Sequence, residues 1–169
     1  MRRLLTHVLS FLALALAALV VALPPAPLRA QAGLVIGGHA ANFGVFDVYG
    51  GFMPDPRTWS VVSGGSIAAS SVSPSCRGYV TAQPDVIVRY SGPASWVRFF
   101  VRAGGDTTLV INDARGRWWC SDDEGGYPNP MVDIASPSAG QYDIWVGSYR
   151  AGEALPSMLH MTELAGVRP

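Results

Sequence analysis

The sequence predicts an all-β protein folded as an antiparallel sandwich or barrel. Three observations support this prediction. Short runs of alternating apolar and polar residues recur roughly every 8–14 residues, as in chains of short strands. Glycine and proline, at 19 and 13 residues, separate these runs. Beyond residue 32, no segment longer than about ten residues has the i, i+3, i+4 apolar spacing of an amphipathic helix.

The expected strands are, in chain order, Gly44–Tyr49, Thr58–Val62, Tyr79–Ala82, Val86–Tyr90, Trp96–Val101, Thr107–Ile111, Arg117–Cys120, Met131–Ile134, Tyr142–Val146 and Met158–Thr162. Turn signals such as Gly50-Gly51 and Gly104-Gly105 lie between them. Because glycine adopts positive φ at low cost and proline cannot donate to a β-ladder, such positions end strands. The Ser63–Ser75 stretch is expected to be the most flexible part of the exported chain.

The period of two is clearest near the C-terminal end. In Tyr142–Ser148, the residues Tyr142, Ile144 and Val146 share one face, which we expect to be buried. Trp145 lies on the opposite face, where it is either covered by the chain before residue 76 or left exposed for a partner. The 96–102 segment alternates in the same way.

The segment 1–32 has the parts of a secretory signal in order. A basic start at Arg2 and Arg3 precedes an uncharged apolar run, Val8–Leu23, and Ala30-Gln31-Ala32 offers a small-x-small cleavage pattern. The alternative is a retained membrane anchor, although the run is shorter than the roughly 20 residues that span a bilayer. We expect cleavage near Ala32, a secreted or periplasmic protein, and no integral membrane segment after processing.

The charge balance gives no general case for nucleic-acid binding. The whole chain has 12 basic and 12 acidic residues, and Arg2, Arg3 and Arg29 all lie within the signal-like segment. The chain from residue 33 onward therefore carries an excess of acidic side chains, whereas phosphate recognition requires a concentrated basic surface. The length of this part fits a single domain with its own core.

The two cysteines, Cys76 and Cys120, both follow the signal. An even number of cysteines in an exported chain predicts one disulfide. The bridge would close a loop of about 44 residues and stabilise the fold by about 4 kcal/mol on the chain-entropy estimate.

A resemblance to a known family rests on a series of short elements. They are, in order, Pro84-Asp85-Val86, Trp96–Val101, Asp106–Asp113, Ser121-Asp122-Asp123 and Ala139–Gly147. In this order they resemble the bacterial pre-peptidase C-terminal domain, here as a short exported subfamily. The resemblance implies a jelly-roll-like sandwich over residues 77–169, after a signal peptide (residues 1–32) and an N-terminal β extension (residues 33–76). It also implies an accessory or binding role without catalytic residues.

No catalytic motif stands out in the sequence. There is no Gly-x-Ser-x-Gly elbow, HExxH motif, P-loop or dinucleotide-binding glycine pattern. Nucleophilic catalysis needs a nucleophile, a base and an orienting group, and only His39 and His160 follow the signal. We therefore expect a non-enzymatic protein and no required cofactor.

Acidic residues gather around the strand Arg117–Cys120. If that strand forms a hairpin, Asp113, Asp122 and Asp123 are expected to approach one another and offer oxygen ligands to Ca²⁺, with Gly125-Gly126 giving backbone freedom. The alternative is a solvated turn whose Asp side chains cap backbone N–H groups.

Aromatic residues gather in the same part of the sequence. Trp118, Tyr127, Trp145 and Tyr149 are candidate ligand-binding residues, because exposed rings stack on sugars or grip peptides. Alternation places Trp118 and Trp119 on opposite faces, so at least one of the two is expected in the core. Trp145 is the strongest candidate for an exposed ring.

Together these patterns favour an exported binding or accessory module with a polysaccharide or protein partner. Two alternatives remain open, namely a structural protein of the cell envelope without a small ligand and an unrecognised hydrolase.

Overall fold

A computed structural model describes residues 33–124 and 128–169, and the expected signal peptide lies outside them. Residues 33–169 belong to one compact unit. Its strands are β1 (Val45–Tyr49), β2 (Arg57–Val62), β3 (Ile67–Ala68), β4 (Tyr79–Val80), β5 (Val86–Ser91), β6 (Trp96–Ala103), β7 (Thr107–Asn112), β8 (Trp118–Ser121), β9 (Met131–Ala135), β10 (Gly140–Ser148) and β11 (Pro156–Thr162). Each of the ten expected strands has a counterpart, and β3 is an additional strand.

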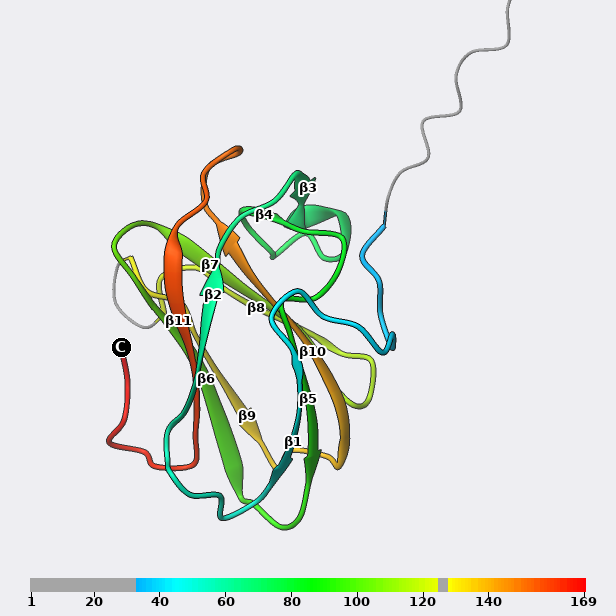
Figure 1. Ribbon diagram of the computed structural model, residues 1–169, viewed down its shortest axis with the longest axis vertical. Helices are drawn as coiled ribbons and strands as arrows, with labels where there is room; N and C mark the ends of the chain where they lie inside the picture. The colour runs from blue at the N-terminus through cyan, green and yellow to red at the C-terminus, as the bar shows by residue number, and fades with distance from the viewer. Residues whose placement is uncertain (1–32, 125–127) are drawn as a thin grey trace, which may run out of the picture. The chain divides into compact units, whose positions relative to one another are not determined.

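The strands form two sheets that face each other (Figure 1). In sheet 1, β10 pairs with β5 and β4 along one edge and with β7 along the other; β1, β3 and β8 extend this sheet outward. Sheet 2 has the order β2-β11-β6-β9. All pairs are antiparallel except β1 with β5, which is parallel. The prediction of an all-β, antiparallel, jelly-roll-like sandwich is confirmed.

The main core lies between the sheets. Tyr142, Ile144 and Val146 of β10 belong to it, as the alternation predicts. Phe99 of β6 packs near Tyr142 with ring centroids 6.2 Å apart. Fully burying one such side chain contributes about 1.5–3 kcal/mol to folding.

The segment before residue 76 is built into the sandwich. It supplies β1 to an edge of sheet 1 and β2 to an edge of sheet 2. The expected N-terminal β extension, residues 33–76, therefore completes both sheets and is not appended to a finished domain.

Strand β10 changes partner partway along its length, and a buried carboxylate satisfies the backbone there. β10 pairs with β5 from Gly140 to Ile144 and with β4 at Ser148. Between these regions, the N–H of Val146 donates to Asp85 Oδ2 at 2.8 Å, and Asn42 Nδ2 donates to Asp85 Oδ1 at 2.9 Å. Burial raises the pKa of Asp85 to about 6, although these hydrogen bonds act to lower it.

A second, smaller core lies on the outer face of sheet 1. It contains Ala69, Cys76, Val80, Val110 and Trp145. Residues 67–78, which we call the disulfide-linked cover, form the outer wall of this second core. The cover contains a short 3-10 helix, Ala69–Ser71. The predicted disulfide between Cys76 and Cys120 is confirmed and ties this cover to β8, with the two Cα atoms 5.1 Å apart.

Close approach of the cover to the sheet depends on Gly78. Its φ is +79°, and a Cβ there would lie 2.6 Å from Thr108 Oγ1 and 2.7 Å from the Ser148 carbonyl oxygen. Only glycine fits this position without displacing backbone. Much of the stretch expected to be flexible, Ser63–Ser75, is thus part of a packed layer.

Among residues 33–124 and 128–169, no helix is long and apolar enough to span a bilayer.

Candidate functional site

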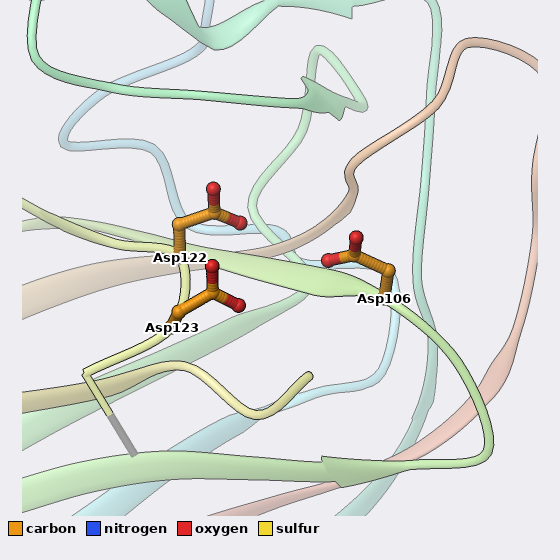
Figure 2. Close-up of side chains that lie close together, drawn as sticks. All are labelled: Asp106, Asp122 and Asp123. Carbon is orange, nitrogen blue, oxygen red and sulfur yellow. The ribbon is translucent and has the colours of Figure 1, made fainter. Parts of the chain in front are cut away.

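Three aspartates converge where the β6–β7 connection meets the end of β8. Asp106 precedes β7, and Asp122 and Asp123 follow β8. Since β7 and β8 are antiparallel, with Leu109 paired to Ser121, the residue before β7 lies near the residues after β8. One carboxylate oxygen from each aspartate lies within 4.8 Å of the others (Figure 2). We call Asp106, Asp122 and Asp123 the acidic trio.

The three carboxylates of the trio repel one another. Burial raises the pKa of Asp122 to about 6, with further contributions from the negative charges of Asp123 and Asp106. The positive charge of Arg77 acts in the opposite direction. Burial and then Asp123 also raise the pKa of Asp106. Crowded carboxylates of this kind favour the binding of either protons or a cation.

Oxygen atoms at this site are withdrawn from solvent without a partner. Within the described residues, Asp106 Oδ1, Asp122 Oδ1 and Asn129 Oδ1 are buried and accept no hydrogen bond. Asn129 follows Pro128, whose carbonyl accepts the N–H of Thr107 at 3.4 Å, so it lies beside the start of β7. Carboxylate and amide oxygens are the ligands that Ca²⁺ prefers.

Asp113 lies outside the trio, contrary to the expected set of Asp113, Asp122 and Asp123. The hairpin does form, but Asp113 lies at its turn, whereas Asp122 follows the far end of β8. Four residues of strand separate the two positions, about 13 Å at the usual rise per residue.

The Asp113 carboxylate is already fully occupied. Oδ1 accepts the N–H groups of Arg115 and Arg117, and Oδ2 accepts Arg117 Nε and Trp119 Nε1, all at 2.8–3.0 Å. Burial acts to raise the pKa of Asp113, but these hydrogen bonds outweigh it and the pKa is lowered. Asp113 therefore organises its own turn.

The capping of backbone N–H groups, which is the alternative stated for Asp113, Asp122 and Asp123, is made by Asp113 at its own turn and, beside the trio, by Glu124. Its carboxylate accepts the hydroxyl of Ser121 and the N–H of Asp122, the latter at 2.9 Å. The Ser121 hydroxyl oxygen also accepts the N–H of Met131 at 2.8 Å, which joins β8 to β9. Asp122 and Asp123 make no side-chain hydrogen bond within the described residues.

Trp145 is not an exposed ring, and this expectation was wrong. The side chain has no solvent exposure, and its ring lies 5.8 Å from that of Trp118 in the second core. The period of two correctly placed Trp145 on the outer face of sheet 1. The disulfide-linked cover lies on that face, so the other outcome stated for Trp145, a cover by the chain before residue 76, is the one that the structure shows.

The other aromatic candidates have different surroundings. Trp118 is half-buried against the second core, while its neighbour Trp119 packs against the main core. Tyr149 is 46% exposed immediately after β10. Tyr127 lies outside the described residues.

A shallow pocket of about 330 Å³ lies in the same part of the molecule as the acidic trio, although no aspartate of the trio lines it. Its lining residues are Ala68, Ser70, Cys76, Arg77, Gly78, Tyr79 and Tyr149. The pocket and the trio are connected in two places. The N–H of Tyr149 donates to the Asp106 carbonyl at 3.1 Å, and Cys76 is bonded to Cys120, which closely precedes Asp122.

Sequence reasoning did not find Asp106, Arg77 or Tyr79. The antiparallel order of the two strands around the Asp113 turn was the available signal for Asp106, since residues flanking a hairpin at equal distance from its turn lie side by side. Arg77 belongs to the cover and Tyr79 to β4, and no local pattern predicted that these segments line a pocket.

No protein-family model matches the chain, and no curated protein matches it.

Proposed function

We propose that this protein is an exported, non-enzymatic binding module with a ligand pocket beside a calcium site. The observation that carries the proposal is the convergence of the acidic trio, which is linked to the pocket through the Tyr149–Asp106 backbone bond and the charge of Arg77 on Asp122. The signal-like segment 1–32 supports export, and the resemblance to pre-peptidase C-terminal domains supports an accessory role.

Calcium fits the chemistry of the trio. The ligands are hard oxygen atoms from two neighbouring connections. A bound divalent cation would relieve the repulsion that raises the pKa of Asp122 and Asp106.

The lining of the pocket includes one cation, Arg77, and two phenol side chains, Tyr79 and Tyr149. Arg77 Nη1 donates to the carbonyl oxygens of Pro74 at 2.8 Å and Cys76 at 3.3 Å, which holds the guanidinium in place. The disulfide restrains the same segment. Preorganisation of this kind lowers the entropic cost of binding. A polysaccharide bearing carboxylate groups suits an arginine flanked by tyrosines, since the rings pack on sugar faces and the guanidinium pairs with the carboxylate.

The calcium part is tested by thermal unfolding. We expect millimolar Ca²⁺ to raise the melting temperature; at 100 times its Kd, a ligand bound only by the native state stabilises it by about 2.7 kcal/mol. The double variant Asp122→Ala/Asp123→Ala should abolish the rise, and Asp47→Asn, at an exposed position on β1, is the matched control. Identical melting curves with calcium and with a chelator would show that the trio is a solvated turn that does not bind calcium.

Calcium affinity should also depend on pH. Because the pKa of Asp122 is about 6, protons compete with the cation as the pH falls through that value. Calorimetric titration at about pH 7.5 and about pH 5 should therefore show weaker binding at the lower pH. Equal affinity at both values would place the cation elsewhere.

The pocket part is tested separately with oligogalacturonate as the probe and dextran as a neutral control. Arg77→Gln and Tyr149→Ala should each weaken oligogalacturonate binding at least about tenfold, or 1.4 kcal/mol. Tyr49→Ala removes a ring that is 64% exposed on β1 and should have no effect. Binding to an acidic peptide but to neither sugar would instead point to a protein partner.

A further inference from the structure

Residues 163–169, which we call the strap, fold back over the outer face of sheet 2 (Figure 1). Two arginines of β6 hold it there. Arg98 Nη1 donates to the carbonyl oxygens of Ala165 at 3.2 Å and Val167 at 3.0 Å, and Arg102 Nη2 donates to that of Arg168 at 2.7 Å. The strap pairs with no strand in the described residues, so its attachment is through side chains.

The strap lies on the face of sheet 2 that carries a buried aromatic ring. Arg98, Phe100 and Arg102 alternate on β6 and therefore point the same way, out of the sandwich. The two arginines that hold the strap flank Phe100 on β6, and Phe100 has no solvent exposure although it lies outside the main core.

His160 lies next to Phe100 in the same layer. The two residues are register partners between β11 and β6, and their rings stack with centroids 4.5 Å apart at an interplanar angle of 13°. His160 is only 8% exposed. Its Nδ1 lies 2.9 Å from Thr58 Oγ1, while its Nε2 is buried without a partner among the described residues.

The charged surroundings of His160 oppose its protonation. Arg102 and Arg98 lie on the neighbouring strand β6, and the strap brings Arg168 to the same side; Thr58 on β2 is neutral. Asp133 on β9 is already held by Arg98 in two bonds of 2.6 and 2.7 Å. Burial and then the charge of Arg102 lower the pKa of His160 to about 4.

The strap itself is weakly packed. Leu164, Ala165, Gly166 and Arg168 are exposed. Glu163 anchors its start, with its carboxylate accepting the Tyr90 hydroxyl and the Gly51 N–H, each at 2.8 Å. Residues 164–169 can therefore leave the sheet without disturbing β11.

We propose that the strap is an acid-released cover: protonation of His160 displaces residues 164–169 and uncovers Phe100 while both sheets stay folded. A second proton on the imidazole places a positive charge on this face beside Arg102 and leaves both ring nitrogens with a hydrogen to donate, although Nε2 has no acceptor among the described residues. Once the strap has left, water can solvate the charge and accept a hydrogen bond from Nε2.

The direction of the effect follows from linkage. In the open state the solvated ring regains a pKa near 6.5, so the open state binds protons more readily than the closed state. Opening is therefore favoured as the pH falls through about 6.5 toward about 4. The opening equilibrium increases about tenfold between about pH 7.5 and about pH 5.5, and about 25-fold by about pH 5.

NMR of the full exported chain tests the proposal. The His160 imidazole resonances and the ¹⁵N relaxation of strap amides, notably Val167, are followed from about pH 7.5 to about pH 4. We expect strap order to fall with the same midpoint as the His160 titration, while amides of β6 and β11 keep their dispersion. His160→Gln should remove the pH dependence, and His39→Gln, at an exposed position, should preserve it.

Two outcomes would overturn the proposal. In the first, the strap stays ordered in the wild-type protein after His160 has titrated. In the second, it loosens only together with the sheets, so that acid unfolds the whole sandwich. Both are read from the wild-type protein and do not depend on the folding of the His160→Gln variant.

Discussion

The two sheets of the sandwich have outer faces that are covered in different ways. On sheet 1, the disulfide-linked cover buries Trp145 in a second apolar core and is bonded covalently to β8. On sheet 2, the strap lies on the face that carries Phe100 and His160 and is held by hydrogen bonds from Arg98 and Arg102. The first cover is attached by apolar packing and a disulfide, and the second is attached by hydrogen bonds and is largely exposed.

This difference teaches that burial of a side chain does not measure how firmly its cover is attached. Trp145 and Phe100 are both without solvent exposure. Removing the cover of Trp145 requires unfolding a core, whereas removing the strap costs a few hydrogen bonds that water can replace, each contributing about 0.5–1.5 kcal/mol net. We therefore expect the first cover to unfold with the sandwich and the second to open independently.

The largest expected effect is at Trp145. Trp145→Ala should lower the free energy of unfolding by about 3–5 kcal/mol, because it leaves a cavity between the cover and the sheet. Denaturant unfolding of the variant measures this loss. Tyr149→Ala, at an exposed ring nearby, is the control and should remain within about 0.5 kcal/mol of wild type. A small loss at Trp145 would mean that the second core contributes little and that the two covers are alike.

Sequence reasoning predicted the fold well and the site only in part. Alternation and turn residues located the strands, because each depends on local backbone geometry and on which face is apolar. The same alternation assigned Trp145 to the outer face correctly and could not reveal that residues 67–78 cover that face. Whether the face is covered depends on how the chain segment held by the disulfide runs over the sheet. The spacing of the two cysteines gives the length of the closed loop but not its course through space.

The acidic trio illustrates the same limit. The sequence predicts that a hairpin around Arg117–Cys120 brings Asp113 to Asp122 and Asp123. The hairpin register instead brings Asp106 to the site and leaves Asp113 at the opposite end of β8. Registers of strand pairs, more than the strands themselves, decide which polar residues meet.

The second-largest effect on stability is expected from removal of the disulfide. The double variant Cys76→Ser/Cys120→Ser should lose up to about 4 kcal/mol of stability on the chain-entropy estimate for its 44-residue separation. Protection of the Trp145 indole from solvent, read by fluorescence quenching, should fall with it. The strap should be unaffected, and a parallel loss of strap order would show that the two faces are coupled.

A third effect is expected at Gly78, where the cover approaches β7 and β10. Gly78→Ala should destabilise the protein by about 1–3 kcal/mol, since the added Cβ meets Thr108 and the Ser148 carbonyl and the backbone has positive φ. Gly104→Ala is the matched control, because no atom lies within 4 Å of the Cβ that it adds. Equal melting temperatures for the two variants would indicate that the cover can shift away from the sheet.

The smallest effect on stability is expected from Arg102→Ala on the other face. It removes the bond to the Arg168 carbonyl and a cation–π contact of 5.5 Å with Phe100, and we expect a loss of at most about 1 kcal/mol because the arginine is exposed. The same variant removes the positive charge that helps to lower the pKa of His160, so this pKa should rise from about 4, as read by NMR titration. Arg115→Ala, at an exposed turn on the far side of β7, should change neither quantity. A loss above about 2 kcal/mol would show that the strap belongs to the cooperative fold, because such a loss exceeds what one exposed hydrogen bond contributes.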